Sequence, residues 1–236
     1  MDSLLKIPVS GSGPLLKTLK GMKVLLIGSG GAARSLAFYL AEGLEKGRLF
    51  LANRDAEKVK TLCREVNEGY QNAEPLSERD IPKVAKAVDL IVNATTKGQQ
   101  GLRRLPDGAV TCLEPYSALA PADPPSLRID DESSFFSTWT RAAKNDIEKN
   151  NQASFKLLLD VPPTTLLFDI IYAPLETVFL KQGRWTGHRT LNGKTMNIAQ
   201  AADAFYEKVV RPLLQEKGLY TQDTYQRLLA AMMAKW

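Results

Sequence analysis

A glycine-rich turn at residues 28–34, with the sequence GSGGAAR, is the feature of this chain best suited to chemistry. It follows the apolar run Lys23 to Ile27 and precedes a helical pattern that begins near Ala32. Glycines at the end of a strand let the backbone approach an anion closely, and the helix that follows points its unpaired N–H groups and positive dipole end at that anion. The turn therefore predicts a binding site for a pyrophosphate group.

A second polar pair, Asn53 and Arg54, follows the strand-like run Arg48 to Ala52. It lies about 20 residues beyond the glycine turn, where dinucleotide-binding folds contact the adenosine ribose. A carboxylate there binds the 2′-hydroxyl of NAD, whereas a guanidinium pairs with the 2′-phosphate of NADP. Arg54 thus favours NADP. Asp55 weakens this preference because its carboxylate would repel a phosphate, and the alternative is that Arg54 is a solvated loop residue.

Alternating strand-like and helical patterns from residue 23 to residue 113 must position these groups. Such alternation is typical of βαβ units and a parallel sheet. We expect an α/β fold, a Rossmann-like doubly wound parallel sheet in a single domain at residues 23–206. The expected strands are 23–27, 48–52, 90–93, 109–113, 166–171 and 190–191, and the expected helices are 32–42, 56–67, 81–87 and 197–210.

A long insertion is expected at residues 114–162, which are rich in proline and contain an acidic cluster. Connections of this length in a compact domain are usually functional or disordered. The aromatic side chains of Phe135, Phe136 and Trp139 argue against full disorder, because a solvated linker contains few large apolar side chains.

The C-terminal residues 207–236 are expected to form an amphipathic helix. Its apolar residues share one stripe at helical spacing: Tyr225, Leu228, Leu229, Met232, Met233 and Trp236. The stripe packs on the chain's own domain in one interpretation and forms a dimer contact in the other.

Composition bounds the classes of function. The chain has 44% hydrophobic and 24% charged residues, as an ordinary globular protein does. No apolar run reaches the roughly 18 residues of a membrane span, and the N-terminus lacks the apolar core of a signal peptide. We therefore expect a cytoplasmic protein without membrane contact. A groove that binds a dinucleotide explains the net charge of +5 just as well as binding to nucleic acid would. We expect no nucleic-acid partner.

The cysteines and the histidine offer no metal site. Cys63 and Cys112 are far apart in sequence and fit no metal-ligand spacing, so we expect both to be reduced and structural. His188 is the only histidine, which excludes a histidine cluster, and we expect it at the surface.

Three segments of the chain together resemble a known family. The first is the glycine turn with NRDAEK at 53–58, the second is DLIVNATTKG at 89–98, and the third is DIIYAPLET at 169–177 continued by NGKTMNIAQA at 192–201. With them, residues 10–113 and 165–206 resemble the C-terminal, nucleotide-binding half of the shikimate dehydrogenase family. The resemblance implies a place in aromatic amino acid biosynthesis and hydride transfer between NADP(H) and a small substrate, a shikimate- or quinate-like alcohol or ketone.

The resemblance also implies roles for individual residues. Tyr172 and Gln200 match family positions that face the substrate. From the residues alone, the preferred interpretation of Met196 is a core residue and that of Gln200 an exposed helix residue. The segment Asn93 to Thr95 is explained equally well by turn chemistry. The positions that match cofactor contacts are Gly28, Ser29, Gly30, Gly31, Ala32, Asn53, Arg54, Lys58, Asn93, Ala94, Thr95, Ile170, Gly193 and Met196.

The family's catalytic lysine and aspartate come from a separate N-terminal domain, and no residue of this chain matches them. Residues 1–22 are interpreted as a remnant of the family's hinge helix, in which Pro8, Val9 and Ser10 replace its Asn, Thr and catalytic Asp. The catalytic residues are therefore unknown, with Lys97 as a weak candidate whose alternative is a solvated loop lysine.

Three hypotheses follow from the missing pair. The first is an NADP-dependent oxidoreductase whose substrate domain is reduced or replaced, with a homodimer or a partner chain supplying the missing half. The second is a non-catalytic regulatory module that binds NADP or a metabolite. The third is an excised C-terminal domain of a longer shikimate dehydrogenase.

Overall fold

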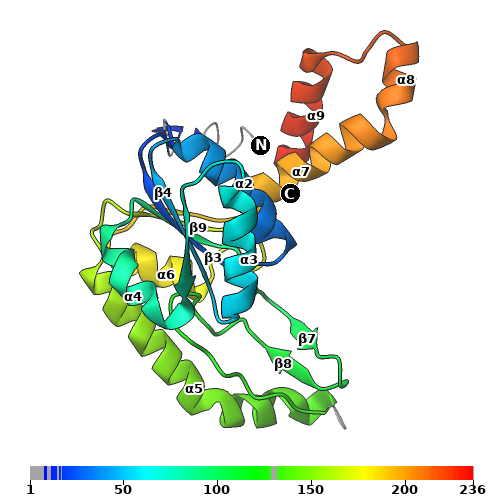
Figure 1. Cartoon of the computed structure of the whole chain (residues 1–236). Helices are drawn as coiled ribbons and strands as arrows, with labels where there is room; N and C mark the ends of the chain where they lie inside the picture. The colour runs from blue at the N-terminus through cyan, green and yellow to red at the C-terminus, as the bar shows by residue number, and fades with distance from the viewer. Residues whose placement is uncertain (1–7, 10–11, 15, 17, 129–131, 236) are drawn as a thin grey trace. The chain divides into compact units, whose positions relative to one another are not determined.

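The computed structural model describes residues 8–9, 12–14, 16, 18–128 and 132–235 of the chain. The chain divides into two units, which are considered separately (Figure 1). The first unit is Thr18–Asn192, and the second combines Met1–Lys17 with Gly193–Trp236. The division falls just before the helix that we expected to close the nucleotide-binding domain, so this helix belongs to the second unit.

A six-stranded parallel sheet forms the centre of the first unit, as expected. Its strand order, β10-β9-β6-β3-β4-β5, reverses direction between β3 and β6, and ligands of open α/β sheets bind at such a switch point. The strands are β3 (Lys23–Ile27), β4 (Arg48–Asn53), β5 (Ala73–Ser77), β6 (Leu90–Asn93), β9 (Leu166–Asp169) and β10 (Thr190–Leu191).

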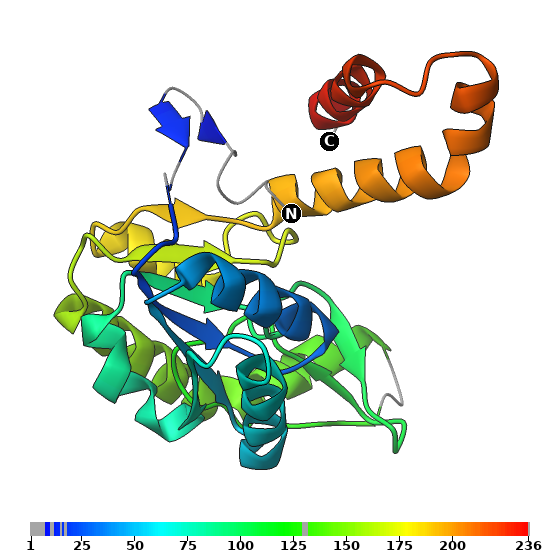
Figure 2. The same cartoon turned by 45° about the horizontal axis from the view of Figure 1, so that its top comes forward.

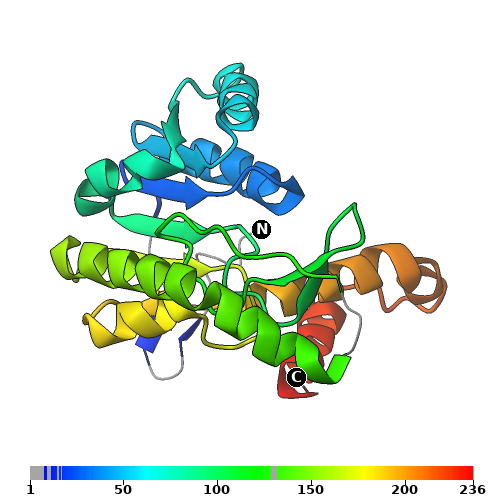
Figure 3. The same cartoon turned by 90° about the horizontal axis from the view of Figure 1, so that it is seen from below.

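Helices cover both faces of the sheet (Figure 3). On one face lie α2 (Gly31–Leu44) and α3 (Ala56–Asn67), which begin directly after β3 and β4. On the other face lie α5 (Glu132–Asp160) and α6 (Val178–Trp185). The short helical segments between β5 and β6 lie on this face too: η1 (Glu78–Asp80), α4 (Ile81–Val84) and η2 (Ala85–Ala87). The core between sheet and helices on this second face includes Leu25, Ile91, Leu158, Leu167 and Phe179.

The expected strand at 109–113 does not belong to the parallel sheet. Its residues form β8 (Val110–Cys112), which pairs antiparallel with β7 (Leu102–Arg104) in a separate hairpin. The run is apolar because it packs in a side cluster with Tyr116, Phe135 and Trp139, and not because it lies at the centre of the sheet. Periodicity alone does not distinguish these two places.

The segment 114–162 is an ordered crossover between β6 and β9 in its described residues, 114–128 and 132–162. The 29-residue helix α5 makes most of it. Phe135 and Trp139 are buried, as their apolar character predicted, whereas Phe136 is exposed. The indole nitrogen of Trp139 donates to the carbonyl oxygen of Pro125 at 2.8 Å, which fixes the proline-rich loop to α5.

The second unit begins with an antiparallel pair, β1 (Pro8–Val9) and β2 (Ser12–Pro14), in place of the hinge helix expected at residues 1–22. Its sequence contains Gly13 and Pro14, which disfavour a helix interior. Ser10 lies outside the described residues.

Helices make the rest of the second unit. They are α7 (Lys194–Ala204), the π-helical segment η3 (Phe205–Val209), α8 (Arg211–Glu216) and α9 (Gln222–Lys235). The single helix expected at 207–236 is thus two helices, and Gly218 with a positive φ lies in the bend between them. Part of the apolar stripe of α9 contacts its own unit, because the ring of Tyr225 lies 5.4 Å from that of Tyr206 in η3. Met233 is 38% exposed and Trp236 lies outside the described residues, so both interpretations of the stripe stay open.

Every helix among the described residues is too short or too polar to span a bilayer.

Candidate functional site

Gly28 brings the ends of three strands together. Its φ of +126° suits only glycine, and a Cβ atom at this position would lie 2.7 Å from the carbonyl oxygen of Ala94. The N–H of Gly28 donates to the carbonyl oxygen of Ala52 at 2.7 Å, and the N–H of Ala94 donates to that of Ile27 at 2.8 Å. The carboxyl ends of β3, β4 and β6 therefore meet at the glycine turn.

The N-terminus of α2 is open at this point. Gly30 is the N-cap and supplies no side-chain hydrogen bond, and the first turn contains no acidic residue. Gly30, Gly31 and Ala32 are exposed, and a side chain at either glycine would meet no atom within 4 Å. Unpaired N–H groups beneath open space are what a pyrophosphate requires, so the turn fits this part of a dinucleotide.

Asn53 connects the end of β4 to the glycine turn. Its side-chain amide donates to the hydroxyl oxygen of Ser29, and its Oδ1 accepts from the N–H of Asp55 at 3.4 Å. Two residues that the resemblance assigns to the cofactor are thus bonded to each other, and Asn53 positions Ser29.

The cations near the end of β4 differ in availability. Arg54 is exposed and has no ion pair with any residue in the described part of the chain. Lys58, by contrast, places its Nζ 3.3 Å from the carboxylate of Asp55. Asp55 also caps α3, accepting from the N–H of Lys58 at 3.2 Å, and this bond lowers the pKa of Asp55. The carboxylate of Asp55, which weakened the NADP assignment, is therefore already paired with Lys58, while Arg54 is available to a phosphate.

Asn93 is fully buried and organises the turn after β6. Its Oδ1 accepts from the N–H of Thr95 at 2.9 Å and from the hydroxyl of Thr95 at 2.7 Å. Its Nδ2 donates to the carboxylate of Asp169 at 3.0 Å and to the carbonyl oxygen of Lys97 at 3.2 Å. All polar atoms of this side chain are used within the protein, so Asn93 shapes the site, while the half-buried Ala94 and Thr95 lie at its surface.

Asp169 is a buried carboxylate that sequence reasoning did not select. It accepts from the N–H of Ile171 at 3.0 Å and from the hydroxyl of Thr177 at 2.7 Å, in addition to Asn93. Burial raises the pKa of Asp169 to about 6, against the opposing effect of these hydrogen bonds. The sequence could have identified Asp169, because its carboxylate stands at the end of an otherwise apolar strand.

Lys97 is paired within the protein. Its ammonium forms an ion pair with Glu78 and donates to the carbonyl oxygen of Ala120 at 2.8 Å. The side chains of Lys97 and Glu78 are each only 13% exposed. The interpretation as a solvated lysine is wrong, since this side chain joins η1 to the loop that precedes α5. A catalytic role for Lys97 stays a prediction.

The segment after β9 lies beside the same edge of the sheet. The N–H of Ile170 donates to the carbonyl oxygen of Asn93 at 3.0 Å, and the half-buried Ile170 is followed by Tyr172, whose side chain is 42% exposed. The bond between Ala173 and Pro174 is cis. Ile170 therefore borders the turn formed by Asn93 to Thr95, and Tyr172 follows it by two residues.

The remaining expected contacts lie on α7, in the second unit. Gly193 is the N-cap of this helix, and its carbonyl oxygen accepts from the N–H of Asn197 at 2.9 Å. Met196 is half-buried and Gln200 is exposed, and their spacing of four places them on one face of α7. Their roles toward cofactor and substrate stay predictions.

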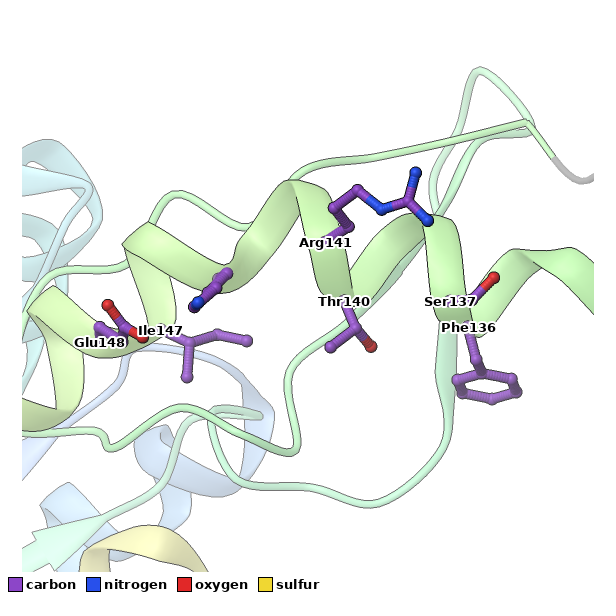
Figure 4. A pocket seen from close by; sticks show the side chains of 7 residues that line it. Phe136, Ser137, Thr140, Arg141, Ile147 and Glu148 are labelled. Carbon is purple, nitrogen blue, oxygen red and sulfur yellow. The ribbon is translucent and has the colours of Figure 1, made fainter.

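A surface hollow of about 640 Å³ lies along α5 (Figure 4). Seven residues of this helix line it: Phe136, Ser137, Thr140, Arg141, Lys144, Ile147 and Glu148. None of these is a residue that we assigned to cofactor or substrate.

The cysteines and the histidine lie outside the site. Cys63 and Cys112 are free and buried, as expected, and burial raises the pKa of Cys63 to about 12, which keeps this thiol protonated. The surface position expected for His188 is wrong: this side chain is 5% exposed, and burial lowers its pKa. Its Nδ1 lies 2.8 Å from the hydroxyl oxygen of Thr186. The described residues contain no cluster of histidine, cysteine and carboxylate side chains arranged for a metal ion.

The comparison with known proteins agrees with this geometry. A family model described as shikimate / quinate 5-dehydrogenase matches residues 14–104, which include the glycine turn, Arg54 and the turn after β6. Over these residues the chain is similar to the shikimate dehydrogenase family.

Several relatives carry the name shikimate dehydrogenase (NADP(+)). The protein of Methanococcus maripaludis is 27% identical over 182 residues, covering 77% of this chain and 48% of the relative. The protein of Halothermothrix orenii is 31% identical over 192 residues, covering 79% of this chain and 50% of the relative. The chain thus spans about half the length of these relatives.

Solved structures share the fold. A quinate dehydrogenase from Corynebacterium glutamicum in complex with NAD aligns with a TM-score of 0.56 at 23% identity, covering 91% of this chain and 56% of the other. A shikimate dehydrogenase in complex with NADP+ aligns with a TM-score of 0.53 at 24% identity, covering 92% of this chain and 55% of the other. At these identities the likeness establishes the Rossmann-like α/β fold.

Proposed function

We propose that this chain binds NADP(H) at the carboxyl ends of β3, β4 and β6, as the nucleotide-binding half of an oxidoreductase of the shikimate dehydrogenase type. The observation that carries the proposal is the close approach of Gly28 to Ala94 beneath the open N-terminus of α2. Relatives named for NADP(+) support the choice of cofactor.

Separate groups would hold separate parts of the cofactor. The N–H groups of Gly30, Gly31 and Ala32 would bind the pyrophosphate, since nothing else in the described chain covers them. The guanidinium of Arg54 would pair with the 2′-phosphate, because it is exposed and has no competing ion pair among the described residues. Ser29, oriented by Asn53, adds a hydroxyl at the same edge.

NADP(H), when bound, supplies or accepts a hydride. A small substrate of the shikimate or quinate class would be contacted by the chain's own residues. The resemblance gives this role to Tyr172 in the first unit and, independently, to Gln200 in the second. Lys97, the candidate from the sequence, has its ammonium paired with Glu78 and is not free to take the hydroxyl proton. The proton acceptor is therefore proposed to come from outside this chain's described residues.

A second folded domain would complete the site. Two observations support this: the chain spans about half the length of its relatives, and the second unit leaves apolar side chains in solvent. Phe205, Val209 and Leu213 are 42%, 64% and 51% exposed and recur every fourth residue. We propose that this stripe contacts a partner chain or domain that supplies the substrate half, with a homodimer as the alternative. The proposal includes a cytoplasmic location.

Titration of NADPH with the purified protein tests cofactor binding. We expect enhanced nicotinamide fluorescence and quenching of tryptophan, and their absence would disprove the proposal. The second measurement is turnover with NADP and shikimate or quinate, with and without a separately expressed substrate domain of a relative. Light scattering at several concentrations distinguishes the homodimer from a monomer that needs a partner.

The pairing of Lys97 with Glu78 also favours a second candidate, a regulatory module that binds NADP or a metabolite without turnover. This candidate predicts that cofactor binding persists while no reduction of NADP appears at any pH, even with the added substrate domain. Turnover under any of these conditions excludes it.

A further inference from the structure

The hairpin of β7 and β8 carries two adjacent arginines that the proposed function does not use. All three residues of β7, Leu102 to Arg104, are exposed. Arg103 pairs with Thr111, whereas Arg104 pairs with Val110, which packs in the side cluster of Trp139. Because successive side chains of a strand point to opposite faces, the two guanidinium groups leave the hairpin on opposite sides.

Arg103 is tied to the turn that borders the candidate site. Its Nη1 donates to the hydroxyl oxygen of Thr96 at 3.3 Å. Thr96 is the second residue after Ala94, the residue whose carbonyl oxygen a Cβ at Gly28 would touch. A short series of contacts therefore joins the guanidinium of Arg103 to the glycine turn.

The base of the hairpin is fixed at this edge of the sheet. The N–H of Gly98 donates to the carbonyl oxygen of Leu113 at 2.8 Å, and the N–H of Gln100 donates to that of Ala173 at 2.9 Å. The far strand is held in turn, because Val110 and Leu127 exchange backbone hydrogen bonds at 2.8 and 2.9 Å. Figure 2 shows the hairpin on the side toward which the strands of the sheet point, where α2 also begins.

The charge of Arg103 has no carboxylate partner in the described part of the chain. The only side-chain hydrogen bond of Arg103 to a described residue is the one to Thr96. A guanidinium has five N–H donors in a planar fork, so several stay available, and their geometry suits phosphate oxygens. An exposed cation at the mouth of an anion site strengthens binding most when no acid of the protein competes for it.

We propose that Arg103 binds the pyrophosphate of the dinucleotide, as a cation opposite the N–H groups of the glycine turn. The proposal rests on the proposed function, since it assigns a further residue to the same site. It differs from the role of Arg54, because the pyrophosphate is common to NADP(H) and NAD(H) whereas the 2′-phosphate belongs to NADP(H) alone. Arg103 would thus raise affinity for both cofactors without selecting between them.

The test compares Arg103→Gln with Arg104→Gln in fluorescence titrations of NADPH and NADH. Glutamine keeps length and polarity but removes the charge. We expect Arg103→Gln to weaken binding of both dinucleotides by the same factor, about tenfold. We also expect it to reduce the sensitivity of binding to salt, because one ion pair is lost. Arg104→Gln is the matched control on the same strand, and its affinities should equal those of the wild type. Circular dichroism confirms that both variants are folded.

Three results would overturn the role of Arg103. They are unchanged affinity in Arg103→Gln, equal losses in both variants, and a loss confined to NADPH, which would place Arg103 at the 2′-phosphate. Failure of the proposed function gives a different result, because then the wild-type protein itself binds neither dinucleotide. Binding by the wild type with no effect of Arg103→Gln rejects this inference alone.

Discussion

Arg54 and Lys58 show how local pairing decides which cation can meet a phosphate. The ammonium of Lys58 lies 3.3 Å from the carboxylate of Asp55, at the N-terminus of α3. Arg54 has no such partner among the described residues. The resemblance assigns both cations to the cofactor, but only Arg54 can pair with it without first giving up an ion pair.

Arg54→Gln should therefore reduce affinity for NADPH by about 10- to 100-fold, the range for losing a charge-assisted bond to phosphate. Affinity for NADH should stay within about twofold, because NADH has no 2′-phosphate. Isothermal titration calorimetry with both cofactors measures the two values. Lys60→Gln, at an exposed position of α3 outside the assigned contacts, is the control, and its affinity for NADPH should change little. Equal losses for NADPH and NADH in Arg54→Gln would contradict the assignment.

Individual residues of the site were predictable from the sequence where their chemistry is local. The glycine turn and Arg54 follow strands whose apolar runs are plain, so their place at the edge of the sheet could be inferred. The burial of Asn93 against Asp169 could not be, because it joins residues 76 positions apart in sequence. The same holds for Lys97 and Glu78, whose ion pair depends on how η1 meets the loop after β6.

At the scale of elements, the predicted bounds were confirmed for helices and strands that have an uninterrupted apolar pattern of their own. The strands β3, β6 and β10 and the helix α3 have the bounds expected from the sequence. The edge strand β5 was missed because Pro75 and Glu74 interrupt its pattern, which an edge position tolerates. Helix α5 was missed although its residues contain neither proline nor glycine. That absence over 29 residues was the feature that could have identified it.

Asn150 fastens α5 to the loop that leads into it. Its Oδ1 accepts from the N–H of Ser117 at 2.8 Å, and its Nδ2 donates to the carbonyl oxygens of Ser117, Ala120 and Pro121 at 2.9 to 3.1 Å. The side chain is 2% exposed, so water cannot replace these bonds. This one amide therefore makes four of the hydrogen bonds that join the loop to the helix, in addition to the bond from Trp139 to Pro125.

Asn150→Ala should lower the free energy of unfolding by about 2 to 4 kcal/mol, because it leaves buried backbone groups without partners. Urea denaturation followed by circular dichroism gives the value. Lys149→Ala, at an exposed position on the same helix, is the matched control and should change stability by less than about 0.5 kcal/mol. A loss in Asn150→Ala no larger than that of the control would mean that the loop does not need this side chain.

At the scale of the whole molecule, two buried titratable groups give stability opposite dependences on pH. Burial raises the pKa of Asp169 to about 6 from 3.8, so the folded chain holds this proton more tightly than the unfolded chain. The resulting stabilisation is complete below about pH 4 and is lost as the pH rises through 6. Burial lowers the pKa of His188 from 6.5, so this group destabilises the folded chain as the pH falls below 6.5.

Asp169→Asn isolates the first of these contributions, because asparagine keeps the shape of the side chain without a titrating proton. The free energy of unfolding of the wild type, relative to this variant, should fall by on the order of 3 kcal/mol between pH 4 and pH 7. For His188→Gln the sign reverses: the wild type should lose stability relative to the variant as the pH falls from 7 to 5. Urea denaturation of the three proteins across this range measures both differences. The difference in free energy of unfolding between the wild type and Asp169→Asn could instead be independent of pH. That result would show that Asn93, Thr177 and the N–H of Ile171 fully compensate the buried charge. The turn beneath the candidate site would then tolerate ionised Asp169 at neutral pH.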